Sequence, residues 1–138
     1  MWFLRVLRFA FSRRGVAVLV VAKRAKDLGE QWYPVRVEGI SMIPTLRPGD
    51  MLAARFPRAG EPRVGQIVLA STDRRELVKR VVTPPEGRVL GQDEFWLQGD
   101  NLHASTDSRA TGPANRKDIF GIVRSRYWPA ARARRFRP

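Results

Sequence analysis

The sequence contains no cysteine and only one histidine, and both shortages limit the chemistry open to it. Without cysteine there can be no disulfides, no zinc–thiolate sites and no cysteine nucleophile. Because His103 is the single histidine, a multi-histidine metal centre is excluded, and a Ser-His-Asp triad would depend on that one residue. We therefore expect neither a metal ion nor another cofactor.

Long hydrophobic runs are also missing. The longest, Gly15–Ala22, has eight residues, whereas a membrane-spanning helix needs about 20. Extending the run back to Trp2 would bury four arginines, each costing on the order of 2.5 kcal/mol at mid-bilayer. We expect residues 1–28 to form a basic amphipathic helix that does not span a membrane. Such a helix either lies peripherally among lipid headgroups or packs on its own domain or on a partner.

Positive charge dominates the composition. The net charge is +13, and 22 arginines stand against four lysines. This excess favours an anionic partner or surface, or it reflects a simple abundance of arginine. No recognition helix, zinc finger or RNA-binding signature accompanies the basic residues, so we expect no specific nucleic-acid partner. A basic adaptor for nucleic acid or membrane surfaces stays open as an alternative.

Short β-rich runs separated by turn residues follow Gly29. With 138 residues, the chain suffices for one domain with a modest core. The pattern predicts a mainly β fold, a small coiled β-sheet or partial barrel behind the N-terminal helix. We place this domain at residues 29–129 and expect the basic tail, residues 130–138, to fray. The expected strands are residues 33–37, 51–55, 66–70, 77–83, 95–98 and 120–128.

Ser41 lies between Ile40 and Met42 in the stretch VEGISMIPTLRPGD. A hydroxyl between apolar residues belongs either to a buried serine with a hydrogen-bond partner or to a serine held out for chemistry. A serine attacks a carbonyl only if a base removes its proton, and a buried neutral lysine can be that base.

Lys79 is the candidate base. In LVKRVV, residues 77–82, strand alternation places Lys79 on one face and Arg80 on the other, each beside two branched aliphatic residues. An inward lysine is desolvated, which lowers its pKa toward that of a general base, whereas an inward arginine can only form a salt bridge. The alternative is an edge strand whose charged side chains reach water.

A polar stretch, GDNLHASTDSRATG, occupies residues 99–112 after the expected strand at 95–98. Gly99 to Asn101 are typical of a turn. Asp107 and Arg109, two residues apart, can form an ion pair across a loop. Alternatively, a segment of this composition is a solvated surface loop.

Three motifs occur in a fixed order: SMIPTL, the KR of LVKRVV, and GDNLHASTDSR. Together they resemble the main boxes of type I signal peptidases, the S26 serine peptidases. The resemblance covers about residues 35–128. LexA-type self-cleaving repressors share the Ser-Met and lysine elements but lack the third box. The resemblance implies a serine endopeptidase with a Ser-Lys dyad, which removes N-terminal signal or leader peptides from precursor proteins.

The resemblance also implies roles for individual residues. Ser41 matches the nucleophile, Lys79 the general base and Ser105 the hydroxyl that orients the lysine. Asp107 and Arg109 match an ion pair that braces the site. The backbone N–H of Ser41 is then one oxyanion-hole donor. The remaining matches are a turn beneath the site, Gly99, Asp100 and Asn101, and the turn of the nucleophile itself, Gly39, Met42, Pro44 and Thr45.

The sequence departs from the resemblance at several points. Gly39 stands where some members carry a serine that supplies a second oxyanion donor. His103 falls in the third motif at a position without a role, and we interpret it as a loop residue. Neither a large insertion after Lys79 nor the usual N-terminal span is present, and we expect a bacterial-type protein, peripherally membrane-associated or cytoplasmic.

Two other hypotheses remain beside the signal-peptidase one, the first a special case of it and the second of another class. A compact chain with an RYWP segment, residues 126–129, resembles the small proteases proposed to mature nickel-type superoxide dismutase. The other is a catalytically silent module that binds leader peptides or anionic surfaces through its arginines.

Overall fold

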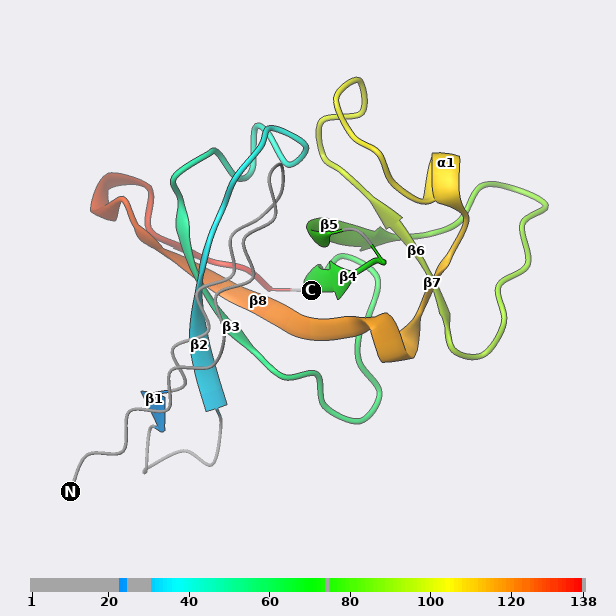
Figure 1. The fold of residues 1–138 in the computed structure, drawn as a ribbon, viewed down its shortest axis with the longest axis horizontal. Helices are drawn as coiled ribbons and strands as arrows, with labels where there is room; N and C mark the ends of the chain where they lie inside the picture. The colour runs from blue at the N-terminus through cyan, green and yellow to red at the C-terminus, as the bar shows by residue number, and fades with distance from the viewer. Residues whose placement is uncertain (1–22, 25–30, 74, 138) are drawn as a thin grey trace.

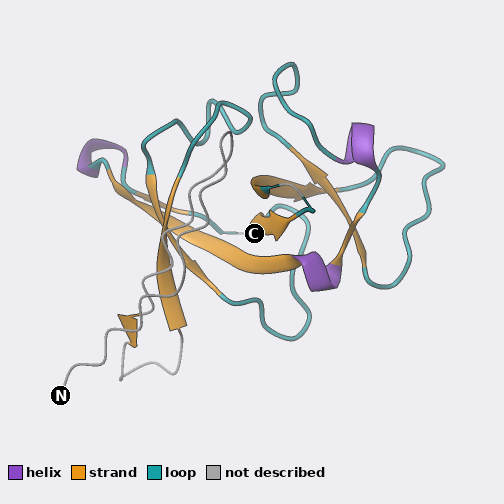
Figure 2. Cartoon of the chain, viewed as in Figure 1, coloured by secondary structure: helices purple, strands orange, loops and turns teal. Residues whose placement is uncertain are grey.

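The structure, a computed structural model, describes residues 23–24, 31–73 and 75–137 (Figure 1). Strands dominate this part of the chain, with three short helical turns between them (Figure 2), so the expected mainly β architecture is confirmed. The strands are β1 Lys23–Arg24, β2 Gln31–Arg36, β3 Met51–Arg55, β4 Ile67–Ser71, β5 Glu76–Val82, β6 Glu94–Gln98, β7 Ala114–Asn115, β8 Ile119–Trp128 and β9 Arg134–Arg135. The helical turns are α1 Ser108–Thr111, η1 Arg116–Asp118 and η2 Ala130–Arg132.

The N-terminal helix expected over residues 1–28 lies almost entirely outside the described residues. Lys23 and Arg24 are the exception, and there the expectation is wrong. These two residues form β1, which pairs antiparallel with Gln31 and Trp32 of β2.

All the strands pair antiparallel in one open sheet, in the order β1-β2-β3-β8-β4-β5-β6-β7. The long strand β8 lies near the middle of this order, between β3 and β4 (Figure 1). Its residues 119–123 pair with β4, and Ser125 and Arg126 pair with β9. Strand β3 runs along the other edge of β8.

Strand β4 has a hydrophobic core on each face. Ile67 and Leu69 belong to one buried cluster, and Val68 and Ala70 belong to another. A strand buried on both faces needs a continuous apolar run instead of alternation, which explains the sequence IVLA. Strand β5 continues both clusters, because Val78 joins the first and Val81 joins the second. Lys79 is two residues from Val81 and so shares its face.

The alternation expected along residues 120–128 is only partly present. Gly121, Ile122 and Val123 are buried in succession. The pairing register shifts between Ala53 and Ala54 on β3 and between Leu69 and Ala70 on β4. Such irregularities rotate successive side chains out of strict alternation. A strand paired on both sides and covered on both faces therefore carries no clean two-residue period.

The basic tail does not fray, contrary to expectation. After η2, Arg134 and Arg135 pair with β8 as strand β9. The backbone N–H of Phe136 donates to the Arg124 carbonyl at 2.8 Å, and its ring packs against the first core cluster. The composition of the tail did not indicate this pairing. An arginine-rich segment has no hydrophobic pattern, yet its backbone can still form the hydrogen bonds of a strand.

The segment between β2 and β3, residues 37–50, closes on itself. The N–H of Val37 donates to the Asp50 carbonyl at 2.9 Å, and the N–H of Gly49 donates to the Val37 carbonyl at 2.8 Å. Gly49 has a φ of +90°, which other residues rarely adopt, so the Pro-Gly turn predicted here depends on this glycine. This closed segment, which connects β2 to β3, carries Ser41.

Candidate active site

Ser41 sits in a turn that a distant segment holds in place. The Ser41 carbonyl accepts a hydrogen bond from the backbone N–H of Asn101 at 2.9 Å. The Asn101 side-chain amide donates to the Ile40 carbonyl at 3.1 Å. Met42 is 2% exposed and packs in the first core cluster, which anchors the turn on its inner side. The backbone on both sides of Ser41 is thus fixed, and its own side chain is half-buried.

Gly99 allows the close approach of these two segments. A Cβ at this position would lie 2.5 Å from the Ser41 carbonyl oxygen and closer still to Ser105 Oγ. No side chain fits there without moving the backbone of Ser41. The sequence suggested a turn at Gly99, and the structure adds that its missing side chain sets the distance between the Ser41 and Ser105 segments.

Lys79 is buried beside Ser105. It is 3% exposed, and its Nζ lies 3.0 Å from Ser105 Oγ. The alternative in which the Lys79 side chain reaches water is therefore wrong. Arg80, on the opposite face, has the role expected of an inward arginine, an ion pair, here with Asp100 at 2.7 Å.

The pKa of Lys79 falls from 10.5 to about 8. Burial is the main cause, because it disfavours the charged ammonium form. The charge of Asp107 opposes this effect, whereas the positive charges of Arg75 and Arg109 add to it. Lys79 thus loses its proton within a range of pH in which an ordinary lysine keeps it.

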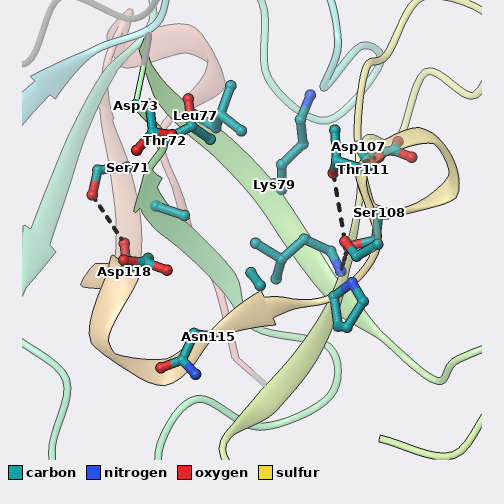
Figure 3. A pocket seen from close by; sticks show the side chains of 15 residues that line it. Ser71, Thr72, Asp73, Leu77, Lys79, Asp107, Ser108, Thr111, Asn115 and Asp118 are labelled. Carbon is teal, nitrogen blue, oxygen red and sulfur yellow. Dashed lines mark hydrogen bonds between the residues drawn. The ribbon is translucent and has the colours of Figure 1, made fainter.

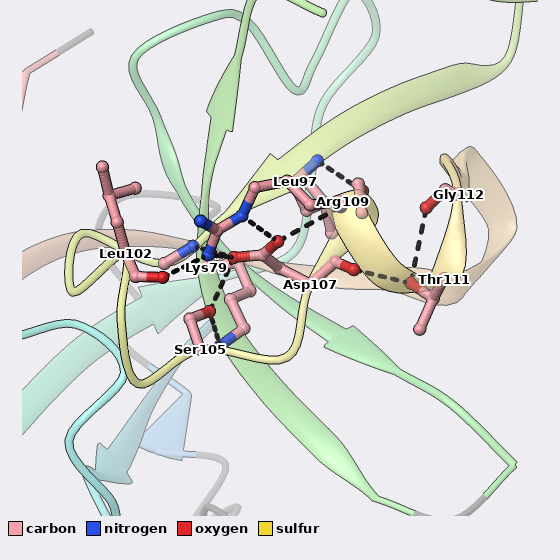
Figure 4. Close-up of polar contacts among 10 residues, drawn as sticks. Lys79, Leu97, Leu102, Ser105, Asp107, Arg109, Thr111 and Gly112 are labelled. Carbon is pink, nitrogen blue, oxygen red and sulfur yellow. Dashed lines mark hydrogen bonds and ion pairs between the residues drawn. The ribbon is translucent and has the colours of Figure 1, made fainter.

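Asp107 is the centre of the hydrogen-bond network around Ser105 (Figure 4). Its Oδ2 accepts from Ser105 Oγ at 2.7 Å and from the backbone N–H of Gly99 at 2.9 Å. Arg109 donates to both carboxylate oxygens, from Nε at 2.9 Å and Nη2 at 3.0 Å. The expected Asp107–Arg109 ion pair is present, and the view of this stretch as a solvated loop is wrong for Asp107, which is 3% exposed.

Local sequence explains how Asp107 is held. It is the N-cap of helix α1, and its Oδ1 accepts from the backbone N–H of Arg109 at 3.2 Å. Burial alone would raise its pKa, but the hydrogen bonds from Arg109, Gly99 and Ser105 outweigh burial and hold the pKa well below its usual range. Asp107 is therefore a fixed negative charge one hydroxyl away from Lys79.

Thr45 and Asp100 form a second link between the two halves of the site. The Asp100 carboxylate accepts two hydrogen bonds from Arg80, at 2.8 and 2.7 Å, and another from the Thr45 side chain. These bonds, against the opposing effect of burial, lower the pKa of Asp100. Arg80 follows Lys79 on β5, so this link runs from the turn of Ser41 to the strand of Lys79.

Ser41 and Lys79 line one pocket of about 420 Å³. It is lined by residues 38–41, by residues 75–79, and by Ala104 and Thr106. Lys79 also lines a second pocket of about 410 Å³, beside Asp107, Ser108 and Thr111 (Figure 3). The base candidate therefore stands at the junction of two cavities.

Not every predicted position lies inside the site. Gly39 lines the pocket of Ser41 and Lys79, with a φ of +81° and open space where a side chain would begin. Pro44 is exposed, and His103 is an exposed residue in a turn, as we expected for a loop residue. No group of three or more metal-binding side chains occurs in the described part of the chain.

Sequence reasoning missed a buried ion cluster next to the turn that carries Ser41. Asp50, 0% exposed, contacts Arg126 and Arg132 of the last segments of the chain. Partners 76 and 82 residues apart leave no local pattern. The only signal was Asp50 itself, a carboxylate directly after a Pro-Gly turn, which was assigned to the turn alone.

Within residues 23–24, 31–73 and 75–137, no helix has the length and hydrophobicity that crossing a bilayer requires.

Comparison with known proteins connects this geometry to proteolysis. The model of a family described as Peptidase S24-like matches residues 13–123. The chain is 35% identical over 115 residues to mitochondrial ATP-independent inner membrane protease subunit 1a of Arabidopsis thaliana, covering 67% of this chain and 68% of that protein. It is also similar to mitochondrial inner membrane protease subunit 1 of Schizosaccharomyces pombe. The two are 29% identical over 136 residues, which cover 83% of this chain and 85% of that protein. The human protein of that name is 34% identical over 115 residues, 69% of each chain.

Proposed function

Because the chain belongs to the Peptidase S24-like family, we propose that it is a serine endopeptidase with a Ser41–Lys79 dyad. The observation that carries this proposal is the buried lysine. Lys79 Nζ lies 3.0 Å from Ser105 Oγ, and Lys79 lines one pocket together with Ser41. A lysine with a pKa of about 8 is neutral often enough to accept a proton near physiological pH.

The chemistry follows in two steps. Neutral Lys79 takes the proton of Ser41 Oγ as that oxygen bonds to the scissile carbonyl carbon, and the backbone N–H of Ser41 donates to the developing oxyanion. The C–N bond then breaks, the leaving amine takes the proton from Lys79, and an acyl-serine ester remains. Water attacks the ester while Lys79 takes the water proton. The proton returns to Ser41 as the acid product leaves.

Ser105, Asp107 and Arg109 have supporting roles in this mechanism. A neutral lysine has two N–H donors and one lone pair. With one N–H directed at Ser105 Oγ, the lone pair is free to face a second group, and Ser41 lines the same pocket. Ser105 in turn donates to Asp107, which Arg109 holds. Gly99 and Asn101 keep the turn of Ser41 against this network.

The free edge of β5 supports the proposal that the substrate binds in an extended conformation. Strand β6 pairs with β5 only from Arg80 to Val82, whereas Glu76 to Lys79 pair with β4 alone among the described strands. Residues of this unpaired edge line the same pocket as residues 38–41. A peptide that adds a strand there presents a carbonyl near Ser41, a mode that main-chain hydrogen bonds stabilise.

We further infer that the substrates are precursor proteins with N-terminal leaders, as the resemblance to type I signal peptidases implies. The relatives named above are inner membrane proteases. This similarity supports the proposal that this chain also acts at a membrane surface. Maturation of a nickel-type superoxide dismutase is a special case within the same proposal, based on the compact chain and the RYWP segment.

The test is cleavage of a panel of secretory precursors and a nickel-superoxide-dismutase precursor, with lipid supplied, across a pH series. We expect cleavage to rise with pH along a limb centred near pH 8, since the active form of Lys79 is the deprotonated one. Ser41→Ala serves as the control and is expected to cut nothing. Cleavage that persists in Ser41→Ala would contradict the Ser41–Lys79 dyad. A folded wild type that neither cleaves nor reacts with a serine-directed phosphonate would favour the catalytically silent module.

Ser105→Ala tests the orienting hydroxyl. We expect kcat to fall roughly 10- to 100-fold, a typical contribution of a group that assists proton transfer. The rising limb should also move to higher pH, because the negative charge of Asp107 raises the pKa of Lys79 and Ser105 would no longer lie between them. Ser108→Ala is the matched control, since this buried serine in the same segment bonds to the N–H of Leu97 and not to Lys79. Equal effects in both variants would contradict the assignment.

A further inference from the structure

Asp50 is a buried carboxylate between two arginines of the C-terminal part of the chain. Its side chain is fully buried. Arg126 Nη1 lies 3.2 Å from Oδ2, and Arg132 pairs with Oδ1. The backbone N–H of Arg47 adds a hydrogen bond to Oδ2 at 2.9 Å. A buried ion pair is a weak source of stability, since desolvation of both charges offsets their attraction, so its position in the fold is the more informative property.

Arg126 joins this cluster to the turn that carries Ser41. Its Nη1 donates to the Thr45 carbonyl at 2.6 Å as well as to Asp50. Its Nε donates to the Arg132 carbonyl at 2.6 Å. The Arg126 side chain is 9% exposed. One guanidinium thus holds Thr45, Asp50 and Arg132, and a planar fork of donors is suited to this, whereas the single ammonium of lysine is not.

Thr45 is where two networks meet. Its carbonyl accepts from Arg126, and its side chain bonds to Asp100, which pairs with Arg80 on the strand of Lys79. The nucleophile turn is therefore held from two sides, by β8 through the backbone and by β5 through the side chain. The N–H of Leu46 donates to the Met42 carbonyl at 2.9 Å, which makes residues 42–46 a single hydrogen-bonded turn.

We propose that Arg126, braced by Asp50 and Arg132, is a positioning residue that fixes the turn of Ser41 relative to Lys79 through the Thr45 carbonyl. The proposal rests on the proposed function, because it assigns Arg126 to the alignment of that dyad. Misplacement of a nucleophile by about 1 Å, caused by a change far from the chemistry, can cost about 100-fold in rate. Arg126 is not in contact with the substrate pocket of Ser41 and Lys79, so substrate binding should change little.

The experiment compares Arg126→Lys with Arg55→Lys in the full chain. Arg55 is a matched control: it is 5% exposed and forms a bidentate pair with Glu61, at 2.8 Å for both bonds, away from the nucleophile turn. We expect both variants to lose stability, measured by denaturant unfolding. Only Arg126→Lys should lower kcat and the rate of phosphonate labelling of Ser41, by about 10- to 100-fold, with KM changed less than about threefold.

Two further readouts separate positioning from general destabilisation. The rising limb of the pH profile should stay near pH 8 in Arg126→Lys, since the surroundings of Lys79 are unchanged. Amide hydrogen exchange of residues 41–46 should speed up in Arg126→Lys and not in Arg55→Lys. A fall in activity that matches the lost folded fraction, and is equal in both variants, would overturn the proposal. If wild type proves inactive, the proposed function fails, and exchange at residues 41–46 still decides whether Arg126 holds the turn.

Discussion

Replacement of Lys79 by methionine is expected to abolish cleavage while making the fold more stable. Removal of the base of a nucleophile–base pair typically costs several orders of magnitude in kcat. Here we expect a loss on the order of 1,000-fold or more. Methionine has a similar length and no charge, so it fills the same volume on the second core face beside Val81. Steady-state cleavage and phosphonate labelling of Ser41 measure the loss.

The gain in stability follows from the pKa of Lys79. Its value of about 8 in the folded chain lies below the ordinary 10.5, so the unfolded chain binds the proton more tightly. Below about pH 8 both states are protonated and the full cost of the buried ammonium is present. Between about pH 8 and 10.5 the unfolded state holds more protons, and wild-type stability rises with pH. We expect Lys79→Met to raise the free energy of unfolding at pH 7 by about 1–3 kcal/mol.

Denaturant unfolding of wild type and Lys79→Met at pH 7 and pH 10 checks this prediction. The difference between the two proteins should shrink at the higher pH, because wild type no longer carries the buried charge there. A variant less stable than wild type at pH 7, or a difference that does not depend on pH, would show that Lys79 is charged and well paired in the folded chain.

Gly99→Ala is expected to have the second largest effect. The added methyl group would stand 2.5 Å from the Ser41 carbonyl oxygen and closer to Ser105 Oγ. The first neighbour is backbone, and the second belongs to a short side chain that Lys79 and Asp107 hold by hydrogen bonds. The Ser41 and Ser105 segments must therefore separate. We expect a rate loss on the order of 100-fold and a destabilisation of about 1–3 kcal/mol, as for other overpacked sites. Cleavage per folded molecule and denaturant unfolding measure the two effects.

Gly121→Ala is a matched control for the steric effect. A Cβ there would overlap Tyr33 Oη and come within 2.6 Å of Leu69 Cδ1, in the first core cluster and away from Ser41. We expect a similar loss of stability with nearly full activity in the molecules that remain folded. If both alanine variants lose activity in proportion, the close approach at Gly99 has no particular role in the alignment of the dyad.

The parts of the fold that were predictable from sequence are those in which a local pattern reflects a local cause. Residues 51–55 were predicted as a strand and form β3 exactly within those bounds. Lys79 was conspicuous because a charged residue among branched aliphatic residues on a strand is rare, since burial of its side chain requires a partner. The Asp107–Arg109 pair was within reach because the two residues are neighbours along the chain.

Interactions between distant segments were not predictable. Nothing in the sequence around Asp50 specifies Arg126, and nothing around Arg134 specifies its pairing with β8. Strand β8 shows the same limit, since its register shifts depend on β3 and β4 together. Whether the positions assigned by the motifs act as proposed is a further question, and the variants described above decide it.

The position of β8 has a consequence for the timing of activity during protein synthesis. Ser41 precedes β3, and Lys79 lies on β5, yet in the sheet β3 and β5 are connected only through β8 and β4 among the described strands. A ribosome therefore makes the proposed nucleophile and base before it makes the strand that joins β3 to β4 in the sheet. Until Ile119 to Trp128 has emerged, a nascent chain lacks this connection within the sheet, so we expect the proposed activity to wait until nearly the whole chain has been made.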